Sequence, residues 1–175
     1  AGNLGLNYKY QASDEATFDL YVDDFDLNNS QDLVLGYFNN GEQFPVRGRQ
    51  CSSEQIPAIE AKFKDYNSFA SASLESIYGK KGLGDALHLQ ISSFSSKVFI
   101  NDGKGNFEAT DLPIEAQYAP INDLIITDID QDSIPDIILA GNLFASEVET
   151  PRADAGVGLL LKGNGDGSFK TVPMN

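Results

Sequence analysis

The sequence predicts an all-β protein in which two four-stranded antiparallel sheets carry one small helical insertion. Three observations lead to this prediction: two acidic windows precede apolar runs, two glycine-rich motifs follow them, and one segment alone has helical periodicity. Near the first window, Phe18, Leu20 and Val22 alternate with more polar residues, which is the period of a strand. Strands are expected near residues 17–23, 32–38, 97–101, 106–110, 122–127, 136–141, 157–162 and 168–172.

The two acidic windows are nine residues long, at 24–32 and 128–136, and they share one spacing of oxygen-bearing side chains. Each window leads directly into an apolar run, Leu33–Leu35 after the first and Ile137–Leu139 after the second. The candidate ligands are the side chains at positions 1, 3, 5 and 9. They are Asp24, Asp26, Asn28 and Asp32 in the first window, and Asp128, Asp130, Asp132 and Asp136 in the second.

This spacing suits a hard cation, and calcium is the natural candidate. Ca²⁺ takes roughly six to eight oxygen ligands, and crowded carboxylates repel one another unless a cation neutralises them. The spacing argues against an EF-hand, because the EF-hand loop needs Gly at position 6 and Glu at position 12. This chain has Asn29 or Ser133 at position 6 and leucine at position 12 of both windows. The alternative is a pair of Asp- and Asn-rich turns without metal, since these side chains also cap turns.

The second repeated element is a glycine-rich hairpin motif. Residues 101–107 (NDGKGNF) match residues 163–169 (GNGDGSF), and an apolar run precedes each. Glycine with Asn or Asp supplies the positive φ angles of a tight hairpin. The first repeat is longer because it holds an insertion at about 42–90, in which helical spacing of apolar residues predicts two short helices within 52–79.

The succession of acidic loop, strand and N-D-G-x-G-x-F hairpin resembles the FG-GAP or VCBS repeat, the blade unit of integrin-α-like β-propellers. The resemblance covers chiefly residues 17–41 and 97–172. Segments outside the repeats are similar to bacterial secreted VCBS-repeat proteins related to cartilage acidic protein. The resemblance implies a partial β-propeller over 1–175, with blade one at about 17–110 around the insertion and blade two at about 119–172.

In that family the acidic loop binds calcium. The resemblance therefore implies two Ca²⁺ sites and adds the carbonyls of Ser30 and Ile134 to the ligands. The second site is expected to depend more on metal, because it offers four Asp side chains against three Asp and one Asn.

Two blades cannot close a propeller, which typically needs about four to eight. The chain is therefore expected to be a piece of a longer protein, or to complete the ring with neighbouring molecules. Exposed sheet edges and apolar blade faces would make the fragment self-associate.

Composition narrows the function classes. The net charge of −14 argues against nucleic-acid binding, which needs Lys and Arg clusters, and no apolar stretch approaches the ~20 residues of a membrane span. The single histidine, His88, is expected to pack half-exposed beside Leu87 and Leu89, and Cys51 is expected to be an ordinary small side chain. No catalytic residue is assigned, although paired carboxylates leave glycoside hydrolysis open on composition alone. Zinc is not expected, because there is neither a histidine pair nor a cysteine cluster.

The sequence thus predicts a non-catalytic, calcium-binding β-propeller segment of an extracellular or bacterial cell-envelope protein, serving cell adhesion or recognition of a protein or glycan ligand. Two alternatives stay open: an accessory or substrate-binding region of a larger secreted enzyme acting on polysaccharide, and a structural spacer. Six polar loop residues are the first to inspect for a ligand, with structural salt bridges as their expected role. They are Arg47, Arg49, Glu147, Glu149, Arg152 and Asp154.

Overall fold

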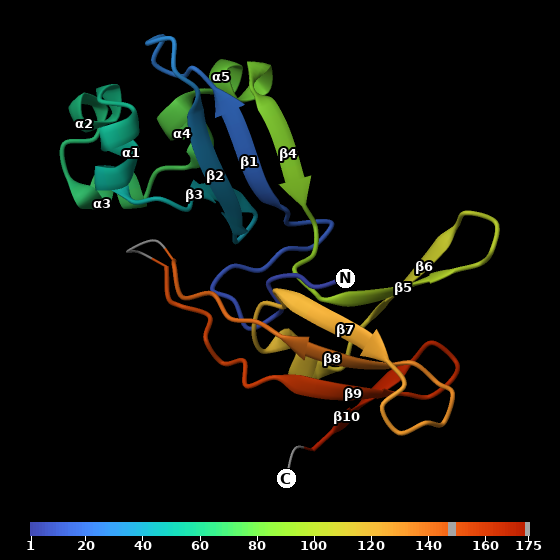
Figure 1. Ribbon diagram of the computed structural model, residues 1–175. Helices are drawn as coiled ribbons and strands as arrows, with labels where there is room; N and C mark the ends of the chain where they lie inside the picture. The colour runs from blue at the N-terminus through green and yellow to red at the C-terminus, as the bar shows by residue number, and fades with distance from the viewer. Residues whose placement is uncertain (147–149, 174–175) are drawn as a thin grey trace. The chain divides into compact units, whose positions relative to one another are not determined.

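The computed structural model describes residues 1–146 and 150–173, which form mostly strands in antiparallel sheets with a few short helices (Figure 1). The chain divides into two compact units. One unit is Tyr10–Ser93, and the other joins Ala1–Lys9 to Phe94–Asn175. Each unit has its own four-stranded sheet and holds one of the two acidic windows, so the two candidate sites are described separately.

The Tyr10–Ser93 unit contains an antiparallel sheet in the order β3-β2-β1-β4. Its strands are β1 (Phe18–Asp23), β2 (Asp32–Asn39), β3 (Glu42–Pro45) and β4 (Leu87–Ile91). The central strand β1 pairs on both edges, so that Leu20 lies opposite Leu35 on one side and Leu89 on the other. The first acidic window is the connection between β1 and β2, where the strand pairing ends at Asp23 and Asp32.

The insertion forms five short helices instead of the two expected. They are α1 (Arg49–Gln55), α2 (Ala58–Lys62), α3 (Tyr66–Ala70), α4 (Leu74–Tyr78) and α5 (Lys80–Asp85). Local capping signals interrupt the two expected helices. The spacing of apolar residues does not reveal these signals. The side chains of Asp65 and Ser73 accept hydrogen bonds from the N–H groups of Ser68 and Ser76, which starts new helices at these points. Gly79 separates α4 from α5 with φ +83°, a backbone conformation that suits glycine.

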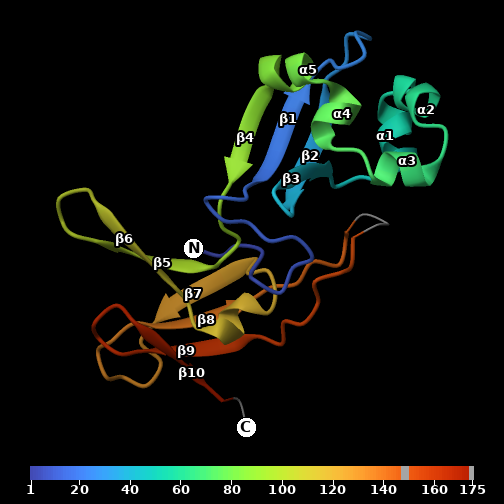
Figure 2. The same cartoon turned by 180° about the vertical axis from the view of Figure 1, so that it is seen from behind.

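The helices α1–α5 lie in one unit with the β3-β2-β1-β4 sheet (Figure 2). Two apolar clusters hold these helices together and attach them to the sheet. The first cluster lies among the helices and consists of Ile56, Ile59, Phe69 and Ile77. In the second, the fully buried Leu74 of α4 packs with Tyr21 of β1 and Val34 of β2. Phe25, the second residue of the acidic window, packs against both clusters, so the helices anchor one side of this loop.

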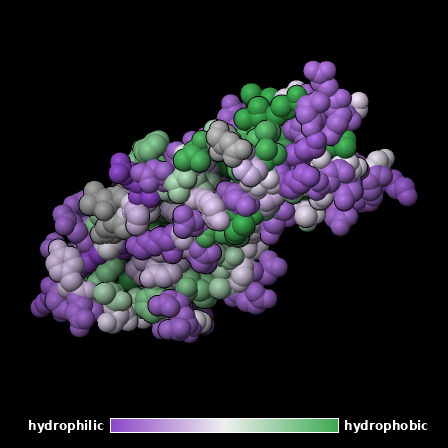
Figure 3. Space-filling view, turned by 90° about the horizontal axis from the view of Figure 1, so that it is seen from below, coloured by the Kyte–Doolittle hydropathy of each residue, from purple (hydrophilic) through white to green (hydrophobic). Residues whose placement is uncertain are grey.

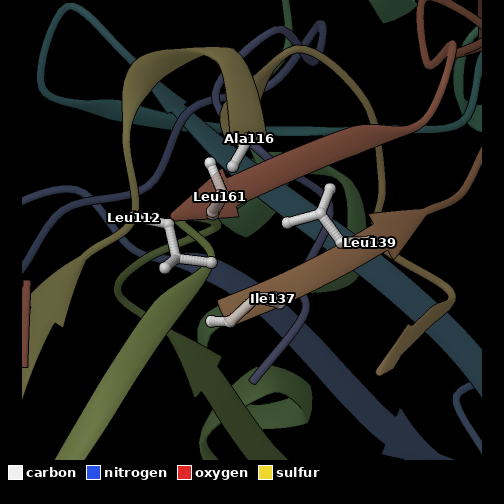
Figure 4. Packing of buried hydrophobic residues seen from close by; sticks show 5 residues of the cluster. All are labelled: Leu112, Ala116, Ile137, Leu139 and Leu161. Carbon is white, nitrogen blue, oxygen red and sulfur yellow. The ribbon is translucent and has the colours of Figure 1, made fainter. Parts of the chain in front are cut away.

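The other unit contains a four-stranded antiparallel meander in the order β10-β9-β8-β7. Its strands are β7 (Asp123–Thr127), β8 (Asp136–Ala140), β9 (Leu159–Gly163) and β10 (Phe169–Val172). A separate hairpin pairs β5 (Lys97–Asn101) with β6 (Phe107–Asp111), and a 3₁₀ helix, η1 (Ile114–Gln117), follows it. Side chains from β8, β9, η1 and the residue that follows β6 converge in the core drawn in Figure 4: Leu112, Ala116, Ile137, Leu139 and Leu161. The second acidic window connects β7 to β8.

Sheet membership differs from the expected blades. The hairpin at 97–110 was expected in blade one, yet it forms a two-stranded sheet of its own in the unit that contains the β7–β10 meander. The sheet around β1 is completed instead by β3 and β4, which lie inside the expected insertion of 42–90. The physical reason is the alternation of Leu87, Leu89 and Ile91, which makes β4 a strand that pairs with the free edge of β1.

Several strands keep large apolar side chains at the surface. The most exposed of these lie on β4, β6 and β7, for example Leu87, Phe107 and Ile126. Apolar residues (green) reach the surface drawn in Figure 3 beside hydrophilic ones (purple). Among the helices of the described residues, none has the length and apolar character needed to cross a membrane.

Candidate metal centres

The two acidic windows fold into loops with the same backbone conformation. Positions 4 and 6 have positive φ in both: +62° and +67° at Leu27 and Asn29, and +62° and +68° at Gln131 and Ser133. Glycine is the residue that adopts such angles most readily, and Asn tolerates them better than Ser. The non-glycine residues at position 6 therefore do not prevent the loop from forming, although Ser133 carries more strain than Asn29.

Side chains of each loop bind its own backbone in the same pattern. The aspartate at position 1 accepts the N–H groups of positions 5 and 6, at 2.9 and 2.8 Å for Asp24 and at 3.1 and 2.9 Å for Asp128. Position 5 accepts the N–H of position 7, at 2.7 Å for Asn28 and 2.9 Å for Asp132. The aspartate at position 9 accepts the N–H of position 2 at 3.0 Å in both loops. These bonds turn each loop around its carboxylates.

Three carboxylates meet in each loop. In the first loop, oxygens of Asp24, Asp26 and Asp32 lie within 4.8 Å of one another, and in the second those of Asp128, Asp130 and Asp136 do so. Such a group can supply three of the oxygens around a hard cation. Asn28 and Asp132 lie in the same loops but direct one oxygen at the backbone. The roles of the Ser30 and Ile134 carbonyls stay predictions.

In the first loop the acidic charge is uncompensated. Asp32 is only 2% exposed, and burial together with the nearby carboxylates of Asp26 and Asp24 raises the pKa of Asp32. A buried oxygen of Asp26, Oδ1, has no hydrogen-bond partner within residues 1–146 and 150–173. No lysine or arginine of these residues forms an ion pair with the three carboxylates. An orphaned carboxylate oxygen beside two others is the arrangement that a bound cation stabilises.

The second loop contains a protein cation. The ammonium of Lys162, on β9, binds Asp130 and lies 3.0 Å from Asp132 Oδ2. These contacts raise the pKa of Lys162 and lower the pKa of Asp132. The next residue of β9, Gly163, donates its N–H to Asp136 Oδ1 at 3.0 Å. A Cβ at Gly163 would lie 2.3 Å from the carbonyl oxygen of Pro135, so glycine is needed for β9 to approach the loop this closely.

The sequence reasoning missed Lys162, although the repeats contained a signal. When Asn101 is aligned with Gly163, Lys162 corresponds to Ile100, so one repeat has a cation where the other has an apolar residue. The expected ranking of the two sites set the extra charge of the second loop against its more constrained backbone and took charge as the larger effect. The ammonium of Lys162 offsets part of that charge, and the ranking stays a prediction.

A second polar cluster lies on β1 and β4, where only half-packing of His88 was expected. Asp19 is 1% exposed and lies 2.5 Å from His88 Nε2, and it accepts hydrogen bonds from Thr17, Gln43 and Gln90. The imidazole also stacks on the ring of Tyr21, with centroids 4.1 Å apart. Within the described residues no serine or cysteine is hydrogen-bonded to His88. This cluster satisfies a buried carboxylate and joins β1 to β4.

The other polar residues singled out have local partners where the structure describes them. Arg49 donates to the carbonyl of Phe63 and pairs with Glu60, and Arg152 pairs with Asp154, as expected for structural salt bridges. Arg47 donates to Gln55 at 3.3 Å, and Cys51 lies half-buried in α1. Glu147 and Glu149 lie outside the described residues.

The chain matches no protein-family model, no curated protein and no solved structure.

Proposed function

We propose that the chain is a non-catalytic, calcium-binding segment of a β-propeller-like protein, secreted or held at the cell surface, where it serves adhesion or ligand recognition. The observation that carries the calcium assignment is the orphaned Oδ1 of Asp26 in a group of three carboxylates that no lysine or arginine of the described residues neutralises. Calcium prefers ligands of this kind, and a bound ion would satisfy the atoms that the protein leaves without a partner.

Three further features support the proposal. The two loops have the same backbone angles and the same internal hydrogen bonds, as repeated ion-binding modules would. The loop of the second unit sits between the first two strands of a four-stranded antiparallel meander, which agrees with the blade of the FG-GAP or VCBS repeat that the sequence resembles. The net charge of the chain is −14, and bound calcium would cancel the part of this charge that the two loops carry.

The calcium assignment is tested by thermal unfolding of EDTA-treated protein titrated with CaCl₂. At one hundred times the Kd, a ligand that binds only the folded state adds about 2.7 kcal/mol to the free energy of unfolding. Asp26→Asn should remove the response of the Tyr10–Ser93 unit. Asp102→Asn is the matched control, because Asp102 is an exposed aspartate that only closes the turn of the β5–β6 hairpin. A wild-type protein whose melting does not respond to calcium would refute the assignment.

Recognition is tested separately, by screening the wild-type chain on glycan and extracellular-protein arrays with calcium and with EDTA. Binding that requires calcium and is lost in Asp26→Asn supports the recognition role. A calcium-binding chain with no ligand on either array would leave a structural spacer as the better description.

A further inference from the structure

We propose that Lys162 is a tethered cation that competes with calcium in the second loop, so that the two sites fill at different calcium concentrations. This inference rests on the proposed function, and it assigns a specificity-determining role to a residue outside both acidic windows. The two loops then differ in kind. The first needs an external cation, whereas the second contains a cation of its own.

The two loops share their backbone conformation and their internal hydrogen bonds. Positive φ at positions 4 and 6, and acceptance of the same backbone N–H groups by positions 1, 5 and 9, make the two backbones equivalent. Each loop also brings the carboxylates of positions 1, 3 and 9 within 4.8 Å of one another. A difference in calcium affinity between the loops must therefore come from side chains that differ, such as Asn28 and Asp132 at position 5, or from groups outside the loops.

The ammonium of Lys162 contacts two carboxylates of the second loop. Asp130 belongs to the carboxylate group of the second loop and is also the residue that Lys162 binds. Asp132, which supplies the extra charge of this loop, lies against the same ammonium. A calcium ion that coordinates Asp130 must displace the ammonium or share the carboxylate with it, and the two cations repel each other.

The pairing of β9 with β8 holds Lys162 beside the loop. Lys162 lies between Leu161, which is fully buried and pairs with Ile137 of β8, and Gly163, whose N–H binds Asp136. The pairing of β8 with β9 therefore fixes the start of the lysine side chain beside the loop. Among the described residues the first loop has no equivalent lysine: the corresponding position of the repeat is Ile100, and its strand β5 is not in the sheet of β1 and β2.

The two loops would therefore respond at different calcium concentrations. At low calcium Lys162 holds the second loop in its folded form, and the first loop is the site that responds. At high calcium the ion replaces the ammonium, and the freed lysine adds a positive charge to the surface beside the loop.

The test measures calcium binding to the second loop alone, by isothermal titration calorimetry of the full chain with CaCl₂ in an Asp26→Asn background that disables the first loop. Lys162→Met keeps the aliphatic stem and removes the charge, and Lys162→Gln is a second neutral variant. We expect both to raise calcium affinity roughly tenfold, since one exposed ion pair changes an equilibrium by a factor of a few and Lys162 contacts two carboxylates. Lys162→Arg, which keeps the charge, should show no such gain.

Lys170→Met is the matched control. Lys170 lies opposite Lys162 in the pairing of β9 with β10, and it forms no ion pair with a described residue. Its removal changes the net charge equally, but Lys170 forms no ion pair with a carboxylate of the loop. The calcium affinity of Lys170→Met should therefore stay within about twofold of the parent, as expected for an exposed charge screened by salt. Unchanged affinity in both neutral Lys162 variants, or an equal gain in Lys170→Met, would overturn the competition while leaving the calcium assignment intact. Absence of calcium binding in the wild type and in every variant would refute the proposed function as well.

Discussion

Asp32→Asn should stabilise the calcium-free protein and weaken the calcium-bound one. The side chain of Asp32 is buried, accepts the Phe25 N–H and lies beside the carboxylates of Asp24 and Asp26. Two unit charges 4.8 Å apart repel by about 0.9 kcal/mol at the permittivity of water, and by more in a protein. Asn removes two such repulsions and keeps an oxygen for the Phe25 N–H. Because the three residues are also close in the unfolded chain, we expect a net gain of about 1 kcal/mol.

With calcium the sign reverses. Asn contributes less charge to the site, so the variant should lose most of the roughly 2.7 kcal/mol that calcium adds to the wild type at one hundred times the Kd. Scanning calorimetry in EDTA and in CaCl₂ measures both effects, and 1 kcal/mol corresponds to a shift in Tm of about 4–8 °C for a unit of this size. A variant that is less stable than the wild type in EDTA, or that keeps the full calcium response, would refute this reasoning.

The pH dependence provides a second check on Asp32. Its pKa in the folded protein is raised above the usual 3.8, by burial first and by neighbouring carboxylates next. The calcium-free folded state therefore binds its proton more tightly than the unfolded state does. The contribution of Asp32 to the free energy of unfolding therefore falls as the pH rises from 3.8 through the folded pKa. In EDTA, Asp32→Asn should flatten this part of the curve of stability against pH.

Asp136→Asn is the matched control. Asp136 is equally buried, but both of its oxygens accept backbone N–H groups, from Gly163 and Ile129. An amide would direct an NH₂ group at one of these donors, which costs about 1–3 kcal/mol. In EDTA, Asp136→Asn should therefore be less stable than the wild type, in contrast to Asp32→Asn. A gain in stability of Asp136→Asn in EDTA would contradict the view that Lys162 already neutralises charge in the second loop.

Two further substitutions test the backbone and the core. Ser133→Gly should stabilise the protein by about 1 kcal/mol, because it relieves a positive φ at an exposed position, and Asn29→Gly should gain less; equal effects in urea unfolding would contradict this ranking. Leu161→Ala should destabilise its unit by about 2–5 kcal/mol, because this residue is fully buried in the core of Figure 4. Val157→Ala, at an 87% exposed position, should be nearly neutral. A near-neutral Leu161→Ala in urea unfolding would show that this core does not stabilise the unit.

The position and shape of the two loops could be predicted from the sequence, and so could most strand positions. Both depend on neighbours in the chain: Asp24 and Asp128 bind backbone groups four and five residues away, and the apolar runs after the windows become β2 and β8. The hairpin of β5 and β6 was also predictable, because Gly103 and Gly105 supply its positive φ angles. Interactions of this range leave a local pattern in the sequence.

Sheet membership and the charge state of the second loop required the tertiary structure. The pairing of β1 with β4 joins residues about seventy positions apart, and nothing near Leu87 in the chain shows which edge it will meet. The ion pair between Lys162 and Asp130 spans 32 positions and exists because β9 pairs with β8. The sequence by itself determined where acidic oxygens gather, because an acidic loop is built from neighbouring residues. Only the packing of strands decided which of the two loops already contains a cation, because a long-range ion pair depends on how the strands are brought together in space.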